Sequence, residues 1–491
     1  MSTRLYTTAQ VRELDRHAIE DLGIAGFDLM RRAADAAWRV LRARWPGIRR
    51  IGVLCGGGNN GGDGYLLACL AREAGASVVV LALAEPATAD ARRARDAWRD
   101  AGGEILAAEH GLPAADVYVD AIFGTGLTRP VEGLVAQTIR RLNATGKPVL
   151  ALDVPSGIDA DTGAVLGVAV RAEITVSLIA RKRGLATGAA VDHCGTLALD
   201  RLGLPEESFV DAPYDARLLD ARRMAVWLPL RSRAAHKGDF GHVLAIGGDA
   251  GMGGAIRLCA EAALRVGAGL VSATTRPENI AVINAARPEV MAHAAIDAAV
   301  PTALLDRANV LALGPGLGQS DWGRKLWRAA LDSHKPTVVD ADALNLLAAQ
   351  AMALPPESVI TPHPGEAARL LGWNTERVEH DRFAAARELA ARYRCVAVLK
   401  GAGTLIAHPE GSVAVCPLGN PGMASGGMGD VLTGVIAGLM AQGLNAWRAA
   451  RFGVALHAQA GDAAARDGEA GTLASDLFRH LRRLRNGLAD D

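Results

Sequence analysis

Residues 419–430 have the composition of a phosphate-binding turn. The segment reads Gly-Asn-Pro-Gly-Met-Ala-Ser-Gly-Gly-Met-Gly-Asp, and apolar residues at helical spacing follow it up to Met440. Glycines let the backbone approach a phosphate, and the unpaired N–H groups at a helix N-terminus attract its charge. Asp430 closes this turn and could either cap the helix or act as a general base beside the phosphate that it helps to transfer. The surrounding glycines favour the general base.

Further glycine and carboxylate blocks accompany the strands predicted in this half of the chain. The predicted strands are 242–246, 270–273, 310–313, 337–339 and 396–399, and the blocks are 236–241, 247–255, 314–318, 340–345, 361–366 and 400–404. Nearly every block follows a strand, so we expect them to gather at one edge of a parallel sheet. These blocks contain neither a Walker P-loop nor the signature motifs of protein kinases.

The first part of the chain repeats the same rhythm. A strand over 51–55, a turn over 56–64, a helix over 65–73 and a strand over 78–82 form a predicted βαβ unit. Residues 56–61 match the G-x-G-x-x-G pattern of dinucleotide cofactor sites, and Glu85 follows the next strand. Asn59, Asn60 and Asp63, however, crowd polar side chains into this turn, and Asp63 would repel a pyrophosphate. These polar side chains therefore argue against a simple hydride-transfer cofactor at this turn.

Two more aspartates end predicted strands in this region. Asp120 lies in the strand 117–122, and Asp153 directly follows the strand 149–152. Each could simply cap a turn. The carboxyl ends of parallel strands nevertheless meet at one edge of the sheet, so we expect these oxygen-bearing side chains to converge on one crevice. Converging oxygens without His or Cys suit a hard cation or a hydroxyl-rich ligand.

Length and composition predict a cytoplasmic protein of two or three domains. The chain has 491 residues, and residues 202–229, with Pro205, Pro213 and Pro229, interrupt the alternation of strands and helices, which places a domain boundary there. Lys plus Arg and Asp plus Glu balance at 53 each, so no global field draws the chain to nucleic acid or a membrane surface. Six scattered cysteines without a CxxC pair indicate reduced thiols, and neither a signal peptide nor a membrane span is evident.

The first domain resembles the epimerase domain of the bifunctional NAD(P)H-hydrate repair enzymes in the blocks 59–63, 123–127 and 152–157. The resemblance implies a Rossmann-like, three-layer α/β domain over 1–215 that interconverts the R and S hydrates of NADH and NADPH (NADHX and NADPHX) at C6 of the nicotinamide ring. It also implies a potassium ion held by Asn60, Asp120 and Ser156, and our hypothesis is that Asp153 transfers the proton. The positions expected to contact the hydrated dinucleotide are Asn59, Asn60, Gly61, Gly62, Asp63, Gly124, Thr125, Gly126, Leu127, Thr128, Arg129, Pro130 and Asp153.

The second domain, 225–491, resembles the ribokinase-like ADP- or ATP-dependent NAD(P)H-hydrate dehydratases, most specifically in the block 419–430. In that family the C6 hydroxyl is phosphorylated and phosphate then leaves, and Asp430 would remove the hydroxyl proton. The positions implied on the hydrate are Ala255, Gly318, His363 and Asp430. Those implied on the adenine nucleotide are Lys400, Gly401, Ala402, Gly403, Thr404 and Gly429. Mg²⁺ is expected with the nucleotide, and Glu366, Asp340 and Asp342 are candidate ligands.

Together the two domains predict a repair enzyme in which the first converts R into S and the second consumes S. The fused layout resembles bacterial members and favours ADP, and the family resemblance favours a homo-oligomer. One alternative on the same fold is a kinase for a vitamin precursor such as hydroxyethylthiazole or hydroxymethylpyrimidine, whose product keeps its phosphate. A different alternative is a non-catalytic protein that only senses the nucleotide.

Overall fold

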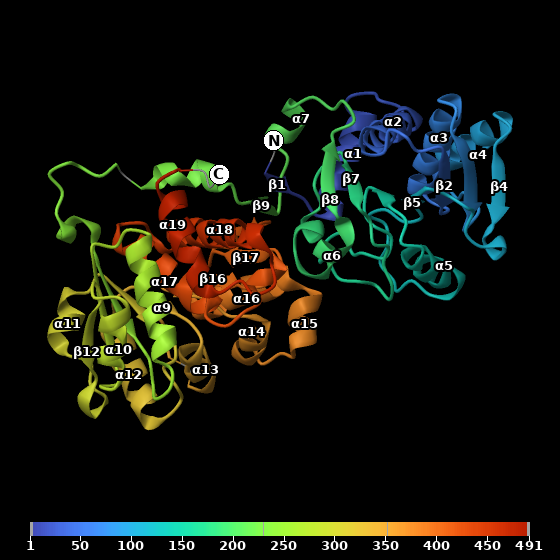
Figure 1. Cartoon of the computed structure of the whole chain (residues 1–491). Coiled ribbons are helices and arrows are strands. Elements are labelled where there is room, and N and C mark those ends of the chain that lie inside the picture. The colour runs from blue at the N-terminus through green and yellow to red at the C-terminus, as the bar shows by residue number, and fades with distance from the viewer. Residues whose placement is uncertain (1–2, 229, 351, 489–491) are drawn as a thin grey trace. The chain divides into compact units, whose positions relative to one another are not determined.

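The computed structural model describes residues 3–228, 230–350 and 352–488, which fold into two compact units (Figure 1). The first unit ends at Ala216 and the second begins at Arg217. This division falls within the proline-containing segment 202–229. Each unit has its own α/β architecture, with a sheet that positions the residues singled out above.

The N-terminal unit contains a parallel sheet in the strand order β4-β3-β2-β5-β6-β7-β8. The strands of this sheet are β2 (Arg50–Cys55), β3 (Ser77–Ala82), β4 (Glu104–Ala107), β5 (Val117–Ala121), β6 (Val149–Leu152), β7 (Ile174–Leu178) and β8 (Thr196–Asp200), and the short strand β1 (Arg4–Leu5) is not part of it. Its helices are α1 (Thr8–Glu20), α2 (Gly26–Arg44), α3 (Asn59–Glu73), α4 (Ala89–Asp100), α5 (Gly133–Ala144), α6 (Val191–Cys194) and α7 (Glu207–Val210).

Helices cover both faces of this sheet, because alternate residues of the buried strands point to opposite sides. Val53 and Cys55 pack into a cluster with α1 to α4, whereas Leu54 of the same strand packs into a cluster with α5. Gly64 lets α3 approach the sheet, since a Cβ there would lie 2.6 Å from Ala121 Cβ. The expected three-layer arrangement is confirmed.

The predicted turn over 56–64 is wrong in its extent. Helix α3 already begins at Asn59, so Asn60 and Asp63 lie in its first turns. Glycine at position 61 is a packing requirement, because a Cβ there would lie 2.0 Å from the carbonyl oxygen of Gly56. The sequence pattern alone did not separate glycines that bend the chain from glycines that allow close contact.

The C-terminal unit contains a sheet in which β10 to β18 follow the order β18-β17-β16-β15-β14-β13-β10-β11-β12. Pairing is parallel from β12 to β16, and β17 and β18 are antiparallel. The strands are β10 (His242–Ile246), β11 (Leu270–Thr275), β12 (Met291–Ala294), β13 (Val310–Leu313), β14 (Thr337–Val339), β15 (Val359–Ile360), β16 (Val396–Leu399), β17 (Thr404–Ala407) and β18 (Val413–Cys416), and β9 (Ala216–Leu218) spans the division between the units.

The helices of this unit also form two layers. They are α8 (Ala221–Met224), α9 (Gly253–Arg265), α10 (Asn279–Ala286), α11 (Thr302–Arg307), α12 (Asp321–Asp332), α13 (Asp342–Ala349), α14 (Pro364–Leu371), α15 (Thr375–His380), α16 (Arg382–Tyr393), α17 (Met428–Ala441), α18 (Ala446–Ala464) and α19 (Leu477–Arg485). Helices α9, α17, α18 and α19 share one apolar core with the sheet, whereas α11, α12 and α16 contact other positions of it.

Helices α9 and α17 lie side by side (Figure 1). Two glycines of α17 allow this close contact, since a Cβ on Gly434 would lie 2.0 Å from Cys259 O and one on Gly438 would lie 2.7 Å from Ala263 O. The N-termini of both helices carry predicted site residues, so their packing holds the site together. Within the described residues, no helix is long and apolar enough to cross a membrane.

Candidate active sites

Each sheet reverses its strand order once, between β2 and β5 in the N-terminal unit and between β13 and β10 in the C-terminal unit. Ligands of open parallel sheets bind outside the carboxyl ends of the strands at such a reversal. The predicted site residues of the first unit lie in or directly after β5 and β6 and at the start of α3. Those of the second lie after β13, β15 and β16 and near the starts of α9 and α17.

In the N-terminal unit, Asp120 is fully buried at the end of β5 and bound to Ser156. The backbone N–H of Ser156 donates to Asp120 Oδ2 at 2.7 Å, and its hydroxyl donates to Oδ1 at 2.6 Å. The Ser156 hydroxyl oxygen also accepts the N–H of Phe123 at 2.8 Å. Burial raises the pKa of Asp120 to about 6, although these hydrogen bonds act in the opposite direction. The turns after β5 and β6 are therefore tied together through one carboxylate.

Asn60 lies in the same crevice with an unpaired side chain. Its amide nitrogen and oxygen are buried and have no hydrogen-bond partner among the described residues. A Cβ on Gly124 would lie 3.7 Å from Asn60 Cγ and 3.4 Å from Asp153 Oδ2. The backbone of Gly124 therefore lies close to both side chains. A buried, unpaired amide is costly unless a ligand or ion completes it.

Asp153 forms an ion pair with Lys182, a residue that the sequence patterns did not indicate. The Lys182 side chain is only 1% exposed, and its ammonium donates to Asp153 Oδ1 and, at 2.7 Å, to the carbonyl oxygen of Leu178. The N–H of Leu178 also donates to Oδ1, at 3.1 Å. Asp153 adopts a φ of 65°, a conformation that costs free energy for a residue with a Cβ and is retained where the surroundings enforce it. Oδ1 is thus occupied, whereas Oδ2 faces Gly124.

Two further carboxyl groups lie near Asp153. Burial, followed by the charges of Asp153 and Asp15, raises the pKa of Asp63 well above its usual range. Burial and the charge of Asp153 also raise the pKa of Asp15, a residue of α1 that the sequence analysis did not select. The raised pKa favours the neutral form of Asp63, in which the carboxyl group can donate a hydrogen bond and does not repel an anionic ligand.

The remaining predicted contacts of this unit lie at the outer edge of the crevice. Residues 126 and 128–130 are exposed, and Gly124, Thr125 and Leu127 are half-buried. Asn59 is exposed and accepts the Thr88 hydroxyl at 2.6 Å. Gly61 and Gly62 are buried inside the start of α3. The segment 124–130 thus forms a surface loop beside Asn60 and Asp153.

In the C-terminal unit, Asp430 lies in the first turn of α17 but does not cap it. The N-cap is Gly427, with a φ of 90°, and no side chain caps this terminus. Among the described residues the Asp430 carboxylate has no hydrogen-bond partner. Burial, and after it the charge of Asp340, raises the pKa of Asp430 to about 7. A carboxyl group with this pKa can accept a proton near neutral pH.

Asp340 and Lys400 form a buried ion pair beside Asp430. Lys400 Nζ donates to Asp340 Oδ1 at 2.8 Å, and the Thr433 hydroxyl of α17 donates to Oδ2 at 2.9 Å. Burial alone would raise the pKa of Asp340, but Lys400 and these hydrogen bonds hold it below its usual value. A Cβ on Gly429 would lie 3.2 Å from Lys400 Nζ and 3.4 Å from Asp340 Oδ2. Gly429 therefore leaves the lysine accessible at the turn.

Arg382 supports the loop that begins at Lys400. Its guanidinium is 1% exposed and donates to the carbonyl oxygen of Lys400 at 3.0 Å and to Glu379 at 3.1 Å. Gly401 has a φ of 127°, and a Cβ there would lie 3.0 Å from this guanidinium. The positive φ and the buried arginine together fix the backbone of the loop 400–403, which the sequence analysis placed on the nucleotide.

The other predicted hydrate contacts lie on neighbouring loops. Gly318 has a φ of 70° and donates its N–H to Asp342 Oδ2 at 2.9 Å. A Cβ on Gly316 would lie 3.2 Å from Ala255 Cβ, so the loop after β13 contacts the start of α9. The structure thus brings Ala255 close to the loop that carries Gly318.

His363 has a structural role through one ring nitrogen. Its Nδ1 accepts the N–H of Gly365 at 3.0 Å, and Glu366 Oε2 accepts the N–H of His363 at 2.8 Å, which caps α14. The ring is half-exposed, and Nε2 lies 3.6 Å from Glu366 Oε1. Burial, then the charges of Lys400 and Arg369, lowers the pKa of His363. The lowered pKa favours the neutral ring, and Glu366 links it to Lys400, whose Nζ lies 3.8 Å from Glu366 Oε2.

A buried histidine behind the glycine turn was not predicted. His457 of α18 has an unpartnered Nε2 among the described residues, and burial lowers its pKa to about 4. No sequence signal separated it from the other histidines. No group of three or more His, Cys, Asp or Glu residues in the described chain has the arrangement of a metal site.

Comparisons with known proteins match both units. Residues 26–184 match the family described as YjeF-related protein N-terminus, and residues 243–483 match the family described as NAD(P)H-hydrate dehydratase. The chain is 49% identical over 490 residues to the bifunctional NAD(P)H-hydrate repair enzyme of Coxiella burnetii, covering 99% of this chain and 100% of the relative. It is 46% identical to the enzyme of the same name from Escherichia coli, covering 97% of this chain and 93% of the relative.

Solved structures match the C-terminal part. An ADP/ATP-dependent NAD(P)H-hydrate dehydratase from Bacillus subtilis, co-crystallised with ATP and Mg²⁺, is 30% identical and covers 56% of this chain and 99% of its own, with a TM-score of 0.51. A ribokinase-like superfamily protein from Enterococcus faecalis is 30% identical and covers 56% of this chain and 96% of its own, with a TM-score of 0.52. The expected ribokinase-like fold of this part is confirmed.

Proposed function

This chain belongs to the family of bifunctional NAD(P)H-hydrate repair enzymes, and we propose that its two units divide the repair between them. It is a metabolite-repair enzyme with an epimerase and a dehydratase activity. The N-terminal unit, up to about residue 215, epimerises the R and S hydrates of NADH and NADPH. The unit from about residue 225 onwards dehydrates the S form with an adenine nucleotide. The observation that carries this division is the pair of separate sites, each with its own aspartate beside a glycine segment.

In the epimerase reaction, Asp153 moves the proton. C6 of the hydrate carries a hydroxyl next to the ring nitrogen, whose electron pair can expel it, so inversion can proceed by breaking the C–O bond and forming it again on the opposite face. Oδ2 is the oxygen available for this step, because Lys182 and the Leu178 N–H occupy Oδ1. Asp153 donates a proton to the departing hydroxyl and takes one from the returning water. Lys182 keeps the carboxylate oriented between these two steps.

Asn60, Asp120 and Ser156 fit a potassium ion. The Asn60 oxygen is buried and unpaired, and Asp120 is a buried carboxylate with no cationic partner within 4 Å among the described residues. A hard monovalent cation would satisfy these oxygens and stabilise the ionised form of Asp120. The ion would supply a fixed positive charge next to the hydrated ring. Epimerisation by Asp153 itself requires only the proton transfer described above.

In the dehydratase reaction, Asp430 takes the proton of the C6 hydroxyl while that oxygen attacks the terminal phosphorus of the nucleotide. The N–H groups at the start of α17 and the Lys400 ammonium stabilise the charge on the transferred phosphoryl group. The P–O bond to the nucleotide breaks in this transfer, so that ADP is released as AMP. Phosphate then leaves C6, because it is a far better leaving group than hydroxide and the ring nitrogen supplies the electron pair. Loss of a proton from C5 then forms the C5=C6 double bond of the dihydronicotinamide. The observation that supports this role is the partly buried Asp430 beside Lys400, in the first turn of a helix that no side chain caps.

The nucleotide would rest on the loop 400–404 and on Gly429, and we favour ADP over ATP. Mg²⁺ would be held mainly by the phosphates and by water, as is usual for nucleotide sites. Asp340 is less suited as a direct ligand, because its charge is already paired with the Lys400 ammonium. Asp342 and Glu366 likewise accept backbone N–H groups of Gly318 and His363.

The test is to incubate the chain with a mixture of NADHX epimers and either ADP or ATP. Recovery of the NADH absorbance band from both epimers is the expected result, and a faster reaction with ADP would support the proposed preference. A stable phosphorylated product would show a kinase whose product keeps its phosphate. Recovery of only the S portion would contradict the proposed epimerase. Asp153→Asn is expected to slow use of the R portion about 10²- to 10⁴-fold and to leave that of the S portion unchanged.

A further inference from the structure

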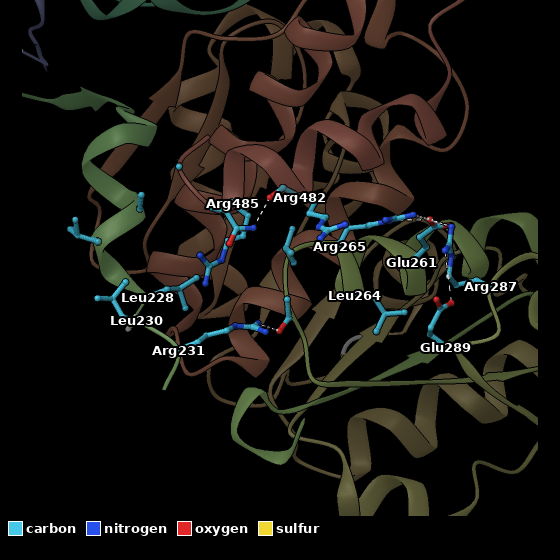
Figure 2. Close-up of a pocket in the computed structure, with 16 residues that line it drawn as sticks. Leu228, Leu230, Arg231, Glu261, Leu264, Arg265, Arg287, Glu289, Arg482 and Arg485 are labelled. Carbon is cyan, nitrogen blue, oxygen red and sulfur yellow. Dashed lines mark hydrogen bonds and ion pairs between the residues drawn. The ribbon is translucent and has the colours of Figure 1, made fainter. Parts of the chain in front are cut away.

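A second cleft lies in the C-terminal unit, away from the cluster of Asp430 and Lys400. Its volume is about 920 Å³, and its walls come from α9, α19 and residues near 225–231 (Figure 2). Clefts of this size hold small molecules. Helix α9 separates the two places, because Ala255 lies in its first turn and Arg265 ends it, and a helix of 13 residues is about 20 Å long.

Positive charge predominates in this cleft. Five arginines and two glutamates line it, namely Arg231, Arg265, Arg287, Arg482, Arg485, Glu261 and Glu289. Figure 2 shows Arg265, Glu261, Arg287 and Glu289 in contact along one wall.

Both carboxylates already have cationic partners. The Glu261 side chain is 2% exposed and accepts hydrogen bonds from Arg265, at 3.0 Å, from Arg287 and, at 3.2 Å, from Arg257. Glu289 lies 3.8 Å from Arg287. Neither Glu261 nor Glu289 therefore pairs with Arg231, Arg482 or Arg485.

Among the described residues, three arginines of the cleft have no acidic partner, namely Arg231, Arg482 and Arg485. Arg231 donates to the carbonyl oxygen of Gly267 and to Gln442 Oε1 at 3.2 Å, and it lies over the ring of Phe240. Arg485 Nε is buried and has no acceptor within residues 3–228, 230–350 and 352–488. Burial and the charge of Arg231 lower the pKa of Arg485, as expected for two cations held near each other.

Helix dipoles account for only part of this arrangement. Arg265, Arg482 and Arg485 lie in the last turns of α9 and α19, where cations are favourable. A dipole does not explain a buried donor without an acceptor, and both Arg287 Nε and Arg485 Nε are such donors. A buried polar group of this kind is costly unless it is paired.

We propose that this cleft binds a phosphate-bearing small molecule of about the size of a mononucleotide. The guanidinium groups of Arg485 and Arg231 donate to the phosphate, and the exposed Arg482 adds charge at the mouth, because guanidinium groups match phosphate oxygens in a two-pronged geometry. Leu228, Leu264 and Val266 form an apolar wall for the uncharged part of the ligand. This site is separate from both catalytic sites.

The experiment is equilibrium dialysis of labelled AMP against the full chain at low salt. AMP is also the product of the proposed ADP-dependent reaction, so we expect two AMP sites, the catalytic loop 400–404 and this cleft. Arg485→Gln should weaken one of them at least tenfold, while the KM for the nucleotide in dehydration stays within twofold. Arg482→Glu alters an exposed residue and should weaken the same site without a risk to folding. Arg479→Gln is the matched control, because Arg479 lies on α19, pairs with Asp467 and does not line the cleft.

Competition by inorganic phosphate tests which part of the ligand is recognised. Displacement of AMP from this site by millimolar phosphate, but not by equal chloride, supports recognition of the phosphate group itself. AMP binding that is equal in the wild type, Arg485→Gln and Arg482→Glu would overturn the proposal. So would equal weakening by Arg479→Gln, since general surface charge would then explain the binding.

Discussion

Both units place an aspartate near the carboxyl ends of the parallel strands of a sheet and a lysine close by, but the lysine has a different partner in each. In the N-terminal unit Lys182 pairs with Asp153 itself, the proposed catalytic group. In the C-terminal unit Lys400 pairs with Asp340, a neighbour of the proposed base Asp430. The lysine therefore holds the first carboxylate in place and leaves the second one without a direct partner.

This difference suits the two reactions. A carboxylate that gives and takes a proton in turn must stay in one orientation, and a buried ammonium at Oδ1 provides that. A base beside phosphoryl groups must lose its own charge on accepting the hydroxyl proton, and burial favours that neutral form. The charge of Lys400, shared with Asp340, is then directed towards the phosphate.

The largest expected effect separates the two sites. Asp430→Asn should slow nucleotide-dependent dehydration of S-NADHX about 10²- to 10⁴-fold, because the base is lost while the shape is kept. Epimerisation should stay at the wild-type rate, measured by chromatographic separation of the R and S hydrates. An equal loss of both activities would contradict two independent sites.

Lys182→Met tests the direct ion pair. We expect it to slow epimerisation about 100-fold or more, since a carboxylate out of place costs this much. Loss of one partner from a buried pair also destabilises a protein by about 3–5 kcal/mol. The exposed Lys147→Met is the control for removing a lysine of the same unit.

The double variant Asp153→Asn with Lys182→Met separates stability from catalysis. Urea unfolding should show part of the stability restored, because no unpaired charge remains buried. Epimerisation should stay as slow as in Asp153→Asn. Recovery of activity together with stability would overturn the proposed role of Asp153, since the double variant lacks that carboxylate.

The rate of dehydration should depend on pH through the ionisation of Asp430. The pKa of Asp430 is raised to about 7, and the base works only when deprotonated. The rate of dehydration should therefore fall about tenfold for each pH unit below 7 and level off above it. Initial rates from pH 5.5 to 8.5 at saturating substrate measure this, and Asp430→Asn should lose the inflection.

A smaller effect is expected at the glycine turn. Gly429→Ala places a Cβ 3.2 Å from Lys400 Nζ, so the ammonium must shift by a few tenths of an ångström, and we expect a loss of about tenfold in dehydration. Gly426→Ala is the matched control, because a Cβ there meets nothing within 4 Å. Equal rates for the two variants would show that Lys400 does not act at this turn.

The sequence alone located much of the framework. The strands 149–152, 242–246, 310–313, 337–339 and 396–399 are found at those bounds, because short apolar runs ended by Gly, Pro or Asp define buried parallel strands well. The glycines of 419–430 indicated a helix that begins after Asp430, whereas α17 already begins at Met428, so the predicted start is three residues late. The glycines of 56–64 did not reveal that α3 begins at Asn59, since the glycines inside this helix allow close packing and do not bend the chain.

The sequence by itself determined that aspartates and glycine segments follow the strands, and therefore that they gather at two sheet edges. Only the tertiary structure decided their partners. Lys182 lies 29 residues from Asp153 and Lys400 lies 60 residues from Asp340, and no local pattern relates the members of either pair. Arg382 and Asp15 come from helices that reach the sites through packing. The physical reason is that an ion pair depends on how distant elements pack in three dimensions, whereas strands and turns follow from neighbouring residues.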